Sequence, residues 1–163
     1  SPMSRGLGDV YKRQEIYGSQ SFEAFFEELK QAFPEVELQY FQSNIEGEIV
    51  DKIQEAGFNS DGIVLNAAGY SHTSVSIGDA VAAVEAPVVC VHISNIHARE
   101  EFRTTDLVTK AAIGSITGLG LEGYELALQY FLKGKRKVWM FRSSNGCIKK
   151  LYPCVKPMQS RMF

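Results

Sequence analysis

The chain has 163 residues, of which 45% are hydrophobic, and these values suit one globular domain with a sizeable buried core. The three cysteines show no metal-type spacing, and their odd number disfavours a disulfide framework. No apolar run approaches the ~18 residues of a membrane span. Residues 1–14 lack the apolar segment of a signal peptide. We therefore expect a cytoplasmic protein without a membrane partner.

The net charge of −2 is unevenly distributed along the chain. Residues 133–163 hold nine Lys or Arg and no acidic residue, whereas residues 1–132 hold eight basic and all 19 acidic groups. A basic tail can mark contact with nucleic acid. This one has neither periodicity nor a binding motif, so we expect residues 133–163 to form a solvated basic extension, with no nucleic-acid partner.

From residue 21 onward, the hydrophobic pattern predicts helices that alternate with strands. The expected elements, in chain order, are a helix from Ser21 to Pro34, a strand over 36–40, a helix capped by Ser43 or Asn44 and ended by Gly57, a strand over 62–65, a helix over 75–84, strands over 88–91 and 111–116, and a helix over 124–131. This alternation indicates a parallel sheet wrapped by helices.

The predicted elements begin with a helix, which leaves one sheet position unassigned. In a flavodoxin-like α/β sheet, ordered 2-1-3-4-5, the first strand of the chain lies inside the sheet. Residues 1–14 contain no apolar run suited to that position. We therefore predict a doubly wound, flavodoxin-like sheet whose first strand is missing or replaced, with unpaired backbone groups on its two neighbours.

Chemically active side chains gather directly after the predicted strand over 88–91. Residues 92–103 contain two histidines, a serine and two arginines. Open α/β sheets bind ligands at the carboxyl ends of their strands. Arginine suits a small anion and histidine moves protons near neutral pH. This segment therefore predicts a site for a small anionic substrate.

Two segments carry a resemblance to a known family. Residues 66–74 read N-A-A-G-Y-S-H-T-S and residues 91–103 read V-H-I-S-N-I-H-A-R-E-E-F-R. They resemble the type II 3-dehydroquinate dehydratases, whose pattern is approximately N-x-x-x-[YL]-[TS]-H-T-S followed by E-V-H-[IL]-S-N-[IV]-H-A-R-E-E-F-R. The resemblance covers residues 15–132, the expected catalytic domain. Residues 1–14 do not match, and we expect them to be an artefact of assembly or cloning.

The resemblance implies removal of water from 3-dehydroquinate to give 3-dehydroshikimate, a step of the shikimate pathway of aromatic amino acid biosynthesis. It assigns Tyr17 as the base and His92 as the general acid. In the family, a Glu two residues before this His orients the imidazole. Here that position is Cys90, and a neutral thiol neither fixes the tautomer nor stabilises imidazolium well.

The remaining site residues are also implied by the resemblance. His72 and Arg103 are assigned to the substrate hydroxyls, and Asn66, Ser94 and the backbone amides of Ile93 and Ser94 to its carboxylate. Asp79 matches a residue that reaches a neighbouring subunit's site, and Arg99 one that supports the charge of the lid tyrosine. His97 matches the pattern but has an open role, catalytic or structural.

No cofactor is expected, because the glycines over residues 114–123 do not form G-x-G-x-x-G. A zinc site made of His72, His92, His97 and Cys90 is an alternative on residue types alone, but its spacing matches no standard motif. The family assembles as trimers packed into dodecamers, so we expect a homo-oligomer. The competing functional hypothesis is a catalytically impaired relative that keeps the fold for ligand binding or assembly, which Cys90 and residues 1–14 favour.

Overall fold

The structure, a computed structural model, describes residues 21–133 and 138–142, so the predictions for residues 1–14 and Tyr17 lie outside the described residues. Its helices and strands are α2 (Phe22–Ala32), β1 (Leu38–Gln42), α3 (Glu46–Gly57), β2 (Gly62–Asn66), α4 (Val75–Ala83), β3 (Val88–His92), β4 (Gly114–Thr117), α5 (Glu122–Leu132) and β5 (Val138–Arg142). Short 3-10 helices are η1 (Ala68–His72), η2 (Ile96–Ala98), η3 (Glu101–Thr104) and η4 (Thr109–Ala111). Among the described residues, the helices are too short or too polar to cross a bilayer.

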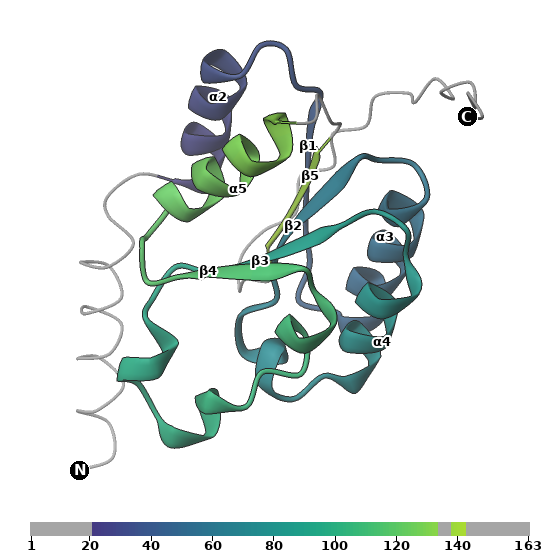
Figure 1. Cartoon of the computed structure of the whole chain (residues 1–163), viewed down its shortest axis with the longest axis vertical. Helices are drawn as coiled ribbons and strands as arrows, with labels where there is room; N and C mark the ends of the chain where they lie inside the picture. Colours follow the sequence, from purple (N-terminus) through teal and green to yellow (C-terminus); the bar gives the residue numbers. More distant parts are fainter. Residues whose placement is uncertain (1–20, 134–137, 143–163) are drawn as a thin grey trace.

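The strands form one parallel sheet in the order β1-β5-β2-β3-β4 (Figure 1). Strand β5 takes the inner position for which residues 1–14 offer no strand. Its Val138 is in register with Leu38 of β1 on one side and with Gly62 of β2 on the other. Of the two predicted alternatives, a missing or a replaced first strand, the described strands show a replaced one.

Two related expectations are wrong. The neighbours of the inner position are not left unpaired, since β5 pairs with both β1 and β2. Residues 138–142 are also not part of a solvated extension, because they form this inner strand. Their run of apolar residues, Val-Trp-Met-Phe, is typical of a parallel strand that is covered on both faces.

The predicted start of α2 at Ser21 is confirmed, whereas the predicted cap of α3 is wrong. Ser21 accepts a hydrogen bond from the Ala24 backbone N–H at the start of α2, and Ser74 caps α4 through the N–H of Ile77. The N-cap of helix α3 is Ile45, so the prediction of Ser43 or Asn44 as its cap is wrong. Instead, the Ser43 hydroxyl accepts the Ile45 N–H at 3.0 Å, which fixes the turn that leads into the helix.

Helices cover both faces of the sheet, with α2 and α5 on one face and α3 and α4 on the other (Figure 1). Because successive side chains of a strand point to opposite faces, Val64 and Val91 pack with α2 and α5, whereas Leu65 and Cys90 pack with α3 and α4. This is the doubly wound, flavodoxin-like arrangement that the sequence predicted. The same alternation decides to which face of the sheet the side chains at the strand ends point.

One strand begins later than predicted. Residues 109–111 belong to the 3-10 helix η4, so β4 starts at Gly114 rather than at Ala111. The loop that contains η3 and η4 is held against η1, where the backbone N–H of Leu107 donates to the Ser71 carbonyl at 2.8 Å. This contact carries the loop to the carboxyl end of β3, where the candidate site lies.

Candidate active site

The centre of the candidate site is an imidazole–carboxylate pair at the end of β3. His92 follows Cys90 by two residues, so it points to the same face of the sheet, toward α3 and α4. Its Nε2 lies 2.8 Å from Oδ2 of Asp106, and the two side chains are only 5% and 11% exposed. Asp106 was not among the predicted site residues, since it matches no position in either motif.

Thr109 holds the Asp106 carboxylate in place. Its backbone N–H donates to Oδ1 and its hydroxyl to Oδ2, both at 2.7 Å. Burial raises the pKa of Asp106, but the hydrogen bonds from His92 and Thr109 outweigh this effect and hold the pKa below its usual value. Asp106 is therefore an anion at neutral pH, fixed beside the imidazole.

Cys90 lies next to this pair as an uncharged group. It is 2% exposed, and burial raises the pKa of its thiol to about 12, although a hydrogen bond with Thr109 opposes the shift. The thiol is therefore protonated at neutral pH. The prediction that Cys90 leaves His92 without a carboxylate partner is wrong, because Asp106 supplies one from the loop before η4.

His72 is the second imidazole of the site. Its ring stacks on that of His92, with 6.1 Å between centroids, and its Nδ1 lies 2.8 Å from the backbone carbonyl oxygen of Thr105. An imidazole nitrogen facing a carbonyl oxygen carries the proton, so the other nitrogen, Nε2, is an acceptor in the neutral ring. This Nε2 is buried and has no hydrogen-bond partner. Two of the predicted site residues are thus brought together, and one presents an open acceptor.

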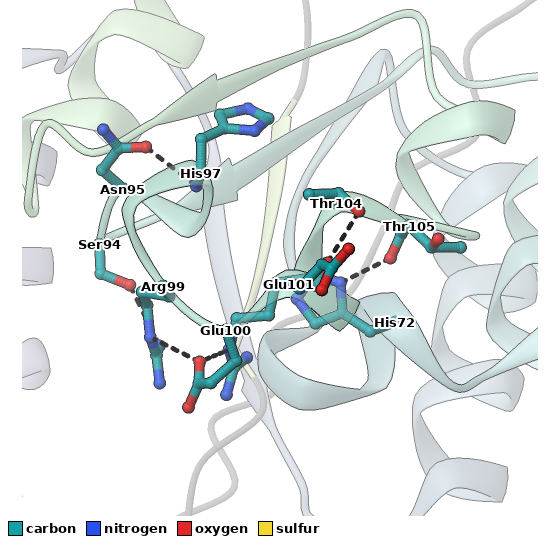
Figure 2. A network of polar contacts seen from close by, with 10 residues as sticks. His72, Ser94, Asn95, His97, Arg99, Glu100, Glu101, Thr104 and Thr105 are labelled. Atoms are coloured by element: carbon teal, nitrogen blue, oxygen red, sulfur yellow. Dashed lines mark hydrogen bonds and ion pairs between the residues drawn. The ribbon is translucent and has the colours of Figure 1, made fainter.

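The arginines of the second motif converge on one acidic residue, Glu100. Figure 2 shows the contact of Arg99 with it. The Nε of Arg103 lies 2.6 Å from Oε2 of Glu100, and that of Arg99 lies 3.4 Å from the same oxygen. Mainly through the hydrogen bond from Arg103, the pKa of Glu100 is lowered to about 2. Arg99 also donates from Nη1 to the Ser94 hydroxyl at 3.3 Å.

Phe102 joins the arginine group to the imidazoles. Its ring contacts that of His72 edge-on, and the Arg103 guanidinium lies 5.1 Å from the centre of the ring. A continuous series of contacts therefore runs from Asp106 through the two imidazoles to Arg103, Arg99 and Ser94. The side chain of Phe102 is 60% exposed, which leaves an apolar surface beside these polar groups.

Three predicted or open residues stand apart from this series. Asn66 points to the opposite face of the sheet, where its Nδ2 donates to the Tyr124 hydroxyl at 2.8 Å and its Oδ1 accepts the Ala68 N–H at 3.0 Å. Asp79 is exposed on α4. His97 is exposed on η2, and Figure 2 shows its ring beside Asn95, on the far side of the loop from His72.

Ile93 and the loop after β4 complete the end of β3. The Gly118 N–H donates to the His92 carbonyl at 2.9 Å, and the Gly120 N–H donates to the Ile93 carbonyl at 3.0 Å. Gly118 has a φ of 87°, and a Cβ there would lie 3.0 Å from that of Asn95. Glycine is required at this position, because both the left-handed backbone and the close approach exclude a side chain.

The ionised state of Asp106 predicts a pH-dependent contribution to stability. Since the folded-state pKa lies below the unfolded value of about 3.9, the contribution is complete well above that value and is lost as the pH falls through the lower, folded-state pKa. We expect Asp106→Ala to lose about 1.5–3 kcal/mol of unfolding free energy at pH 7. Urea unfolding at pH 7 and pH 3 checks this, and a loss of equal size at both pH values would contradict it.

The described residues contain no group of three or more His, Cys, Asp or Glu side chains that could hold a metal ion. They do contain an imidazole bound to a fixed carboxylate, a second imidazole with an open acceptor, and two guanidinium groups that contact Glu100. A flavodoxin-like α/β domain with polar groups gathered at this place belongs to the class of α/β proteins whose ligand site lies at the carboxyl ends of parallel strands.

Comparison with known proteins narrows this class to one family. The chain matches the family described as dehydroquinase class II over residues 7–132, and it belongs to that family. It is 55% identical, over 115 residues, to the 3-dehydroquinate dehydratase of Campylobacter jejuni subsp. doylei, covering 69% of this chain and 72% of the relative. It is 50% identical over 128 residues to that of Fusobacterium nucleatum, covering 75% and 86%.

A solved structure agrees with the fold. The type II dehydroquinase from Butyrivibrio crossotus has a TM-score of 0.69 and 41% sequence identity to this chain, covering 73% of this chain and 85% of its own. The recognition of this family from the two strand-end motifs is therefore confirmed. The family match begins at residue 7, within the segment that the motifs alone left unmatched.

Proposed function

We propose that this protein removes water from 3-dehydroquinate to give 3-dehydroshikimate, as a hydro-lyase of the shikimate pathway. The observation that carries the proposal is the buried His92–Asp106 pair beside His72 at the carboxyl end of β3, in a chain of the dehydroquinase class II family. Relatives carry the name 3-dehydroquinate dehydratase at 55% identity, which supports the same reaction here.

In this reaction, a base removes the proton next to the ketone and an acid protonates the leaving hydroxyl. We assign the acid to His92, because its Nε2 is bound to Asp106 and Nδ1 is the ring nitrogen left to exchange a proton. We assign the base to Tyr17, which lies outside the described residues. No cofactor takes part in this scheme.

Recognition of the substrate is assigned to the groups around these two residues. His72 would accept a substrate hydroxyl at its unpartnered Nε2, and Arg103 would bind a second hydroxyl. Ser94 and the amides of Ile93 and Ser94 would bind the carboxylate. The family resemblance also assigns Asn66 to the carboxylate, although its side chain points to the opposite face of the sheet and donates to the Tyr124 hydroxyl. Arg99 would support the charge of Tyr17, and Asp79 would reach the site of a neighbouring subunit.

The direct test is a spectrophotometric assay with 3-dehydroquinate, because the product contains a conjugated enone that absorbs in the ultraviolet. We expect the absorbance to rise on addition of the protein. A protein that binds 3-dehydroquinate, as measured by calorimetry, but releases no enone would contradict the proposal. That result would instead support an impaired relative that keeps the fold as a binding module.

Variants should separate binding from chemistry. We expect Tyr17→Phe to abolish turnover while leaving binding intact, since its hydroxyl is needed only for proton transfer. His72→Ala and Arg103→Ala should mainly weaken substrate binding, because both contact the substrate throughout the reaction. Steady-state kinetics together with calorimetric titration measure both effects. If Tyr17→Phe keeps most of the activity, the base is misassigned.

We also propose that the protein forms a homododecamer built of trimers and acts in the cytoplasm. The support is the assembly expected from the family resemblance, the exposed position of Asp79 on α4, and the acidic body of the chain. Sedimentation velocity with the wild-type protein and Asp79→Ala measures the assembly. A wild-type protein that sediments as a monomer at micromolar concentration would contradict it.

A further inference from the structure

The His92–Asp106 pair has the geometry of a positioning contact. Both side chains are shielded from water, and one oxygen of the carboxylate faces the imidazole Nε2 at 2.8 Å. Thr109 supplies two further hydrogen bonds to the same carboxylate, so Asp106 cannot rotate without breaking three contacts. A hydrogen bond to a buried, ionised acceptor is shorter and stronger than one between neutral groups.

This geometry determines which imidazole nitrogen is available for chemistry. An ionised carboxylate is only an acceptor, so Nε2 of His92 must carry a proton in both charge states of the ring. Proton exchange is then restricted to Nδ1.

We propose that Asp106 is the positioning residue of His92, supplying from the loop before η4 the carboxylate that position 90 does not provide, and that Thr109 orients Asp106. This inference rests on the proposed function for its catalytic consequence, but the contact itself can be tested without activity. It assigns Asp106 and Thr109 to the site, although neither lies in the two motifs, residues 66–74 and 91–103.

Asp106 contacts His92 on the face of the sheet to which Cys90 also points. Because side chains two residues apart on a strand point the same way, a carboxylate at position 90 would approach the imidazole from within the strand. Asp106 reaches it from the loop instead, and Thr109 contacts both Asp106 and Cys90. A small uncharged residue at position 90 therefore leaves room for Asp106, whereas two carboxylates would repel each other.

The first experiment replaces only the charge. We expect Asp106→Asn to lower kcat about 10- to 100-fold, part of the 10²–10⁴-fold typical of general-acid assistance, with little change in KM. The kcat–pH profile should change as well, because the substitution removes the carboxylate charge that contacts the imidazole. Asp51→Asn, an exposed carboxylate on α3, is the matched control and should change neither quantity. An active wild type whose kcat and pH profile are unchanged in Asp106→Asn would overturn the inference.

A second measurement does not depend on turnover. Two-bond ¹⁵N–¹H correlation spectra of the histidine rings distinguish protonation at Nε2 from protonation at Nδ1. We expect His92 in the wild type to give the pattern of a proton fixed on Nε2, and Asp106→Asn to lose it, with His97 as an exposed reference ring. If the wild type makes no enone but shows this pattern, the proposed function fails and the positioning contact stands. A wild-type ring protonated only at Nδ1 would overturn the contact.

The third experiment moves the carboxylate. We expect Cys90→Glu alone to lower activity, because it places a second anion beside Asp106. In combination with Asp106→Ser, the same substitution should recover part of the kcat that Asp106→Ser loses. Recovery in the double variant would show that His92 requires a carboxylate rather than a particular residue. A folded double variant with no more activity than Asp106→Ser would overturn the inference that a carboxylate at position 90 can replace the one at position 106.

Discussion

Ending the chain after Lys137 is expected to abolish cooperative folding. This truncation removes β5, the strand that pairs with β1 on one side and β2 on the other. Buried backbone groups left without partners cost about 1–3 kcal/mol each, and a domain of this kind is stable by only ~5–15 kcal/mol. Circular dichroism during thermal unfolding should show no sigmoidal transition, in contrast to the full chain. A truncated chain that melts like the full one would show that β5 is not part of the sheet.

Point substitutions at Met140, in β5, should lower the stability by smaller amounts that depend on the volume removed. Met140 is fully buried and packs in the core between the sheet and helices α2 and α5. Met140→Ala should lose about 2–5 kcal/mol of unfolding free energy, whereas Met140→Leu, which nearly conserves volume, should lose less than about 1.5 kcal/mol. Urea unfolding at pH 7 measures both. Equal losses in the two variants would argue against a packed position.

His92→Asn is expected to lower kcat by about 10²–10⁴-fold, the usual contribution of a positioned acid. Asparagine keeps a polar group of similar size beside Asp106 but has no titratable proton to give to the leaving hydroxyl. The enone assay measures the loss, and circular dichroism should confirm that the variant is folded. Because the substitution leaves Arg103 and Ser94 in place, substrate affinity should change much less than kcat.

The matched control for this variant is His97→Asn. The His97 ring is exposed and lies away from His72 (Figure 2), the imidazole that stacks on His92. The activity of His97→Asn should equal that of the wild type, and this result would assign His97 a structural rather than a catalytic role. If His97→Asn loses as much activity as His92→Asn, the general acid is misassigned.

The local elements could be predicted from the sequence because each is encoded within a few residues. The helical spacing of Phe22, Phe25, Phe26 and Leu29 predicts α2, and the apolar run over 62–65 predicts the buried strand β2. The site at the carboxyl end of β3 could also be predicted, because two long motifs indicated the family and placed His72 and His92 in one site. These patterns depend on periodicity and on residue types, which a sequence displays directly.

Only the tertiary structure decided which distant segments contact one another. Strand β5 enters the sheet between β1 and β2, about a hundred and about seventy-five residues away in sequence, and no local pattern specifies which gap an apolar strand will fill. Asp106 lies beside His92 in a loop that the Leu107 N–H ties to Ser71, a residue far away in sequence. Strand pairing and side-chain hydrogen bonds depend on where the chain returns in space, so the missing strand and the missing carboxylate were visible in the sequence as gaps, and only the fold identified what fills them.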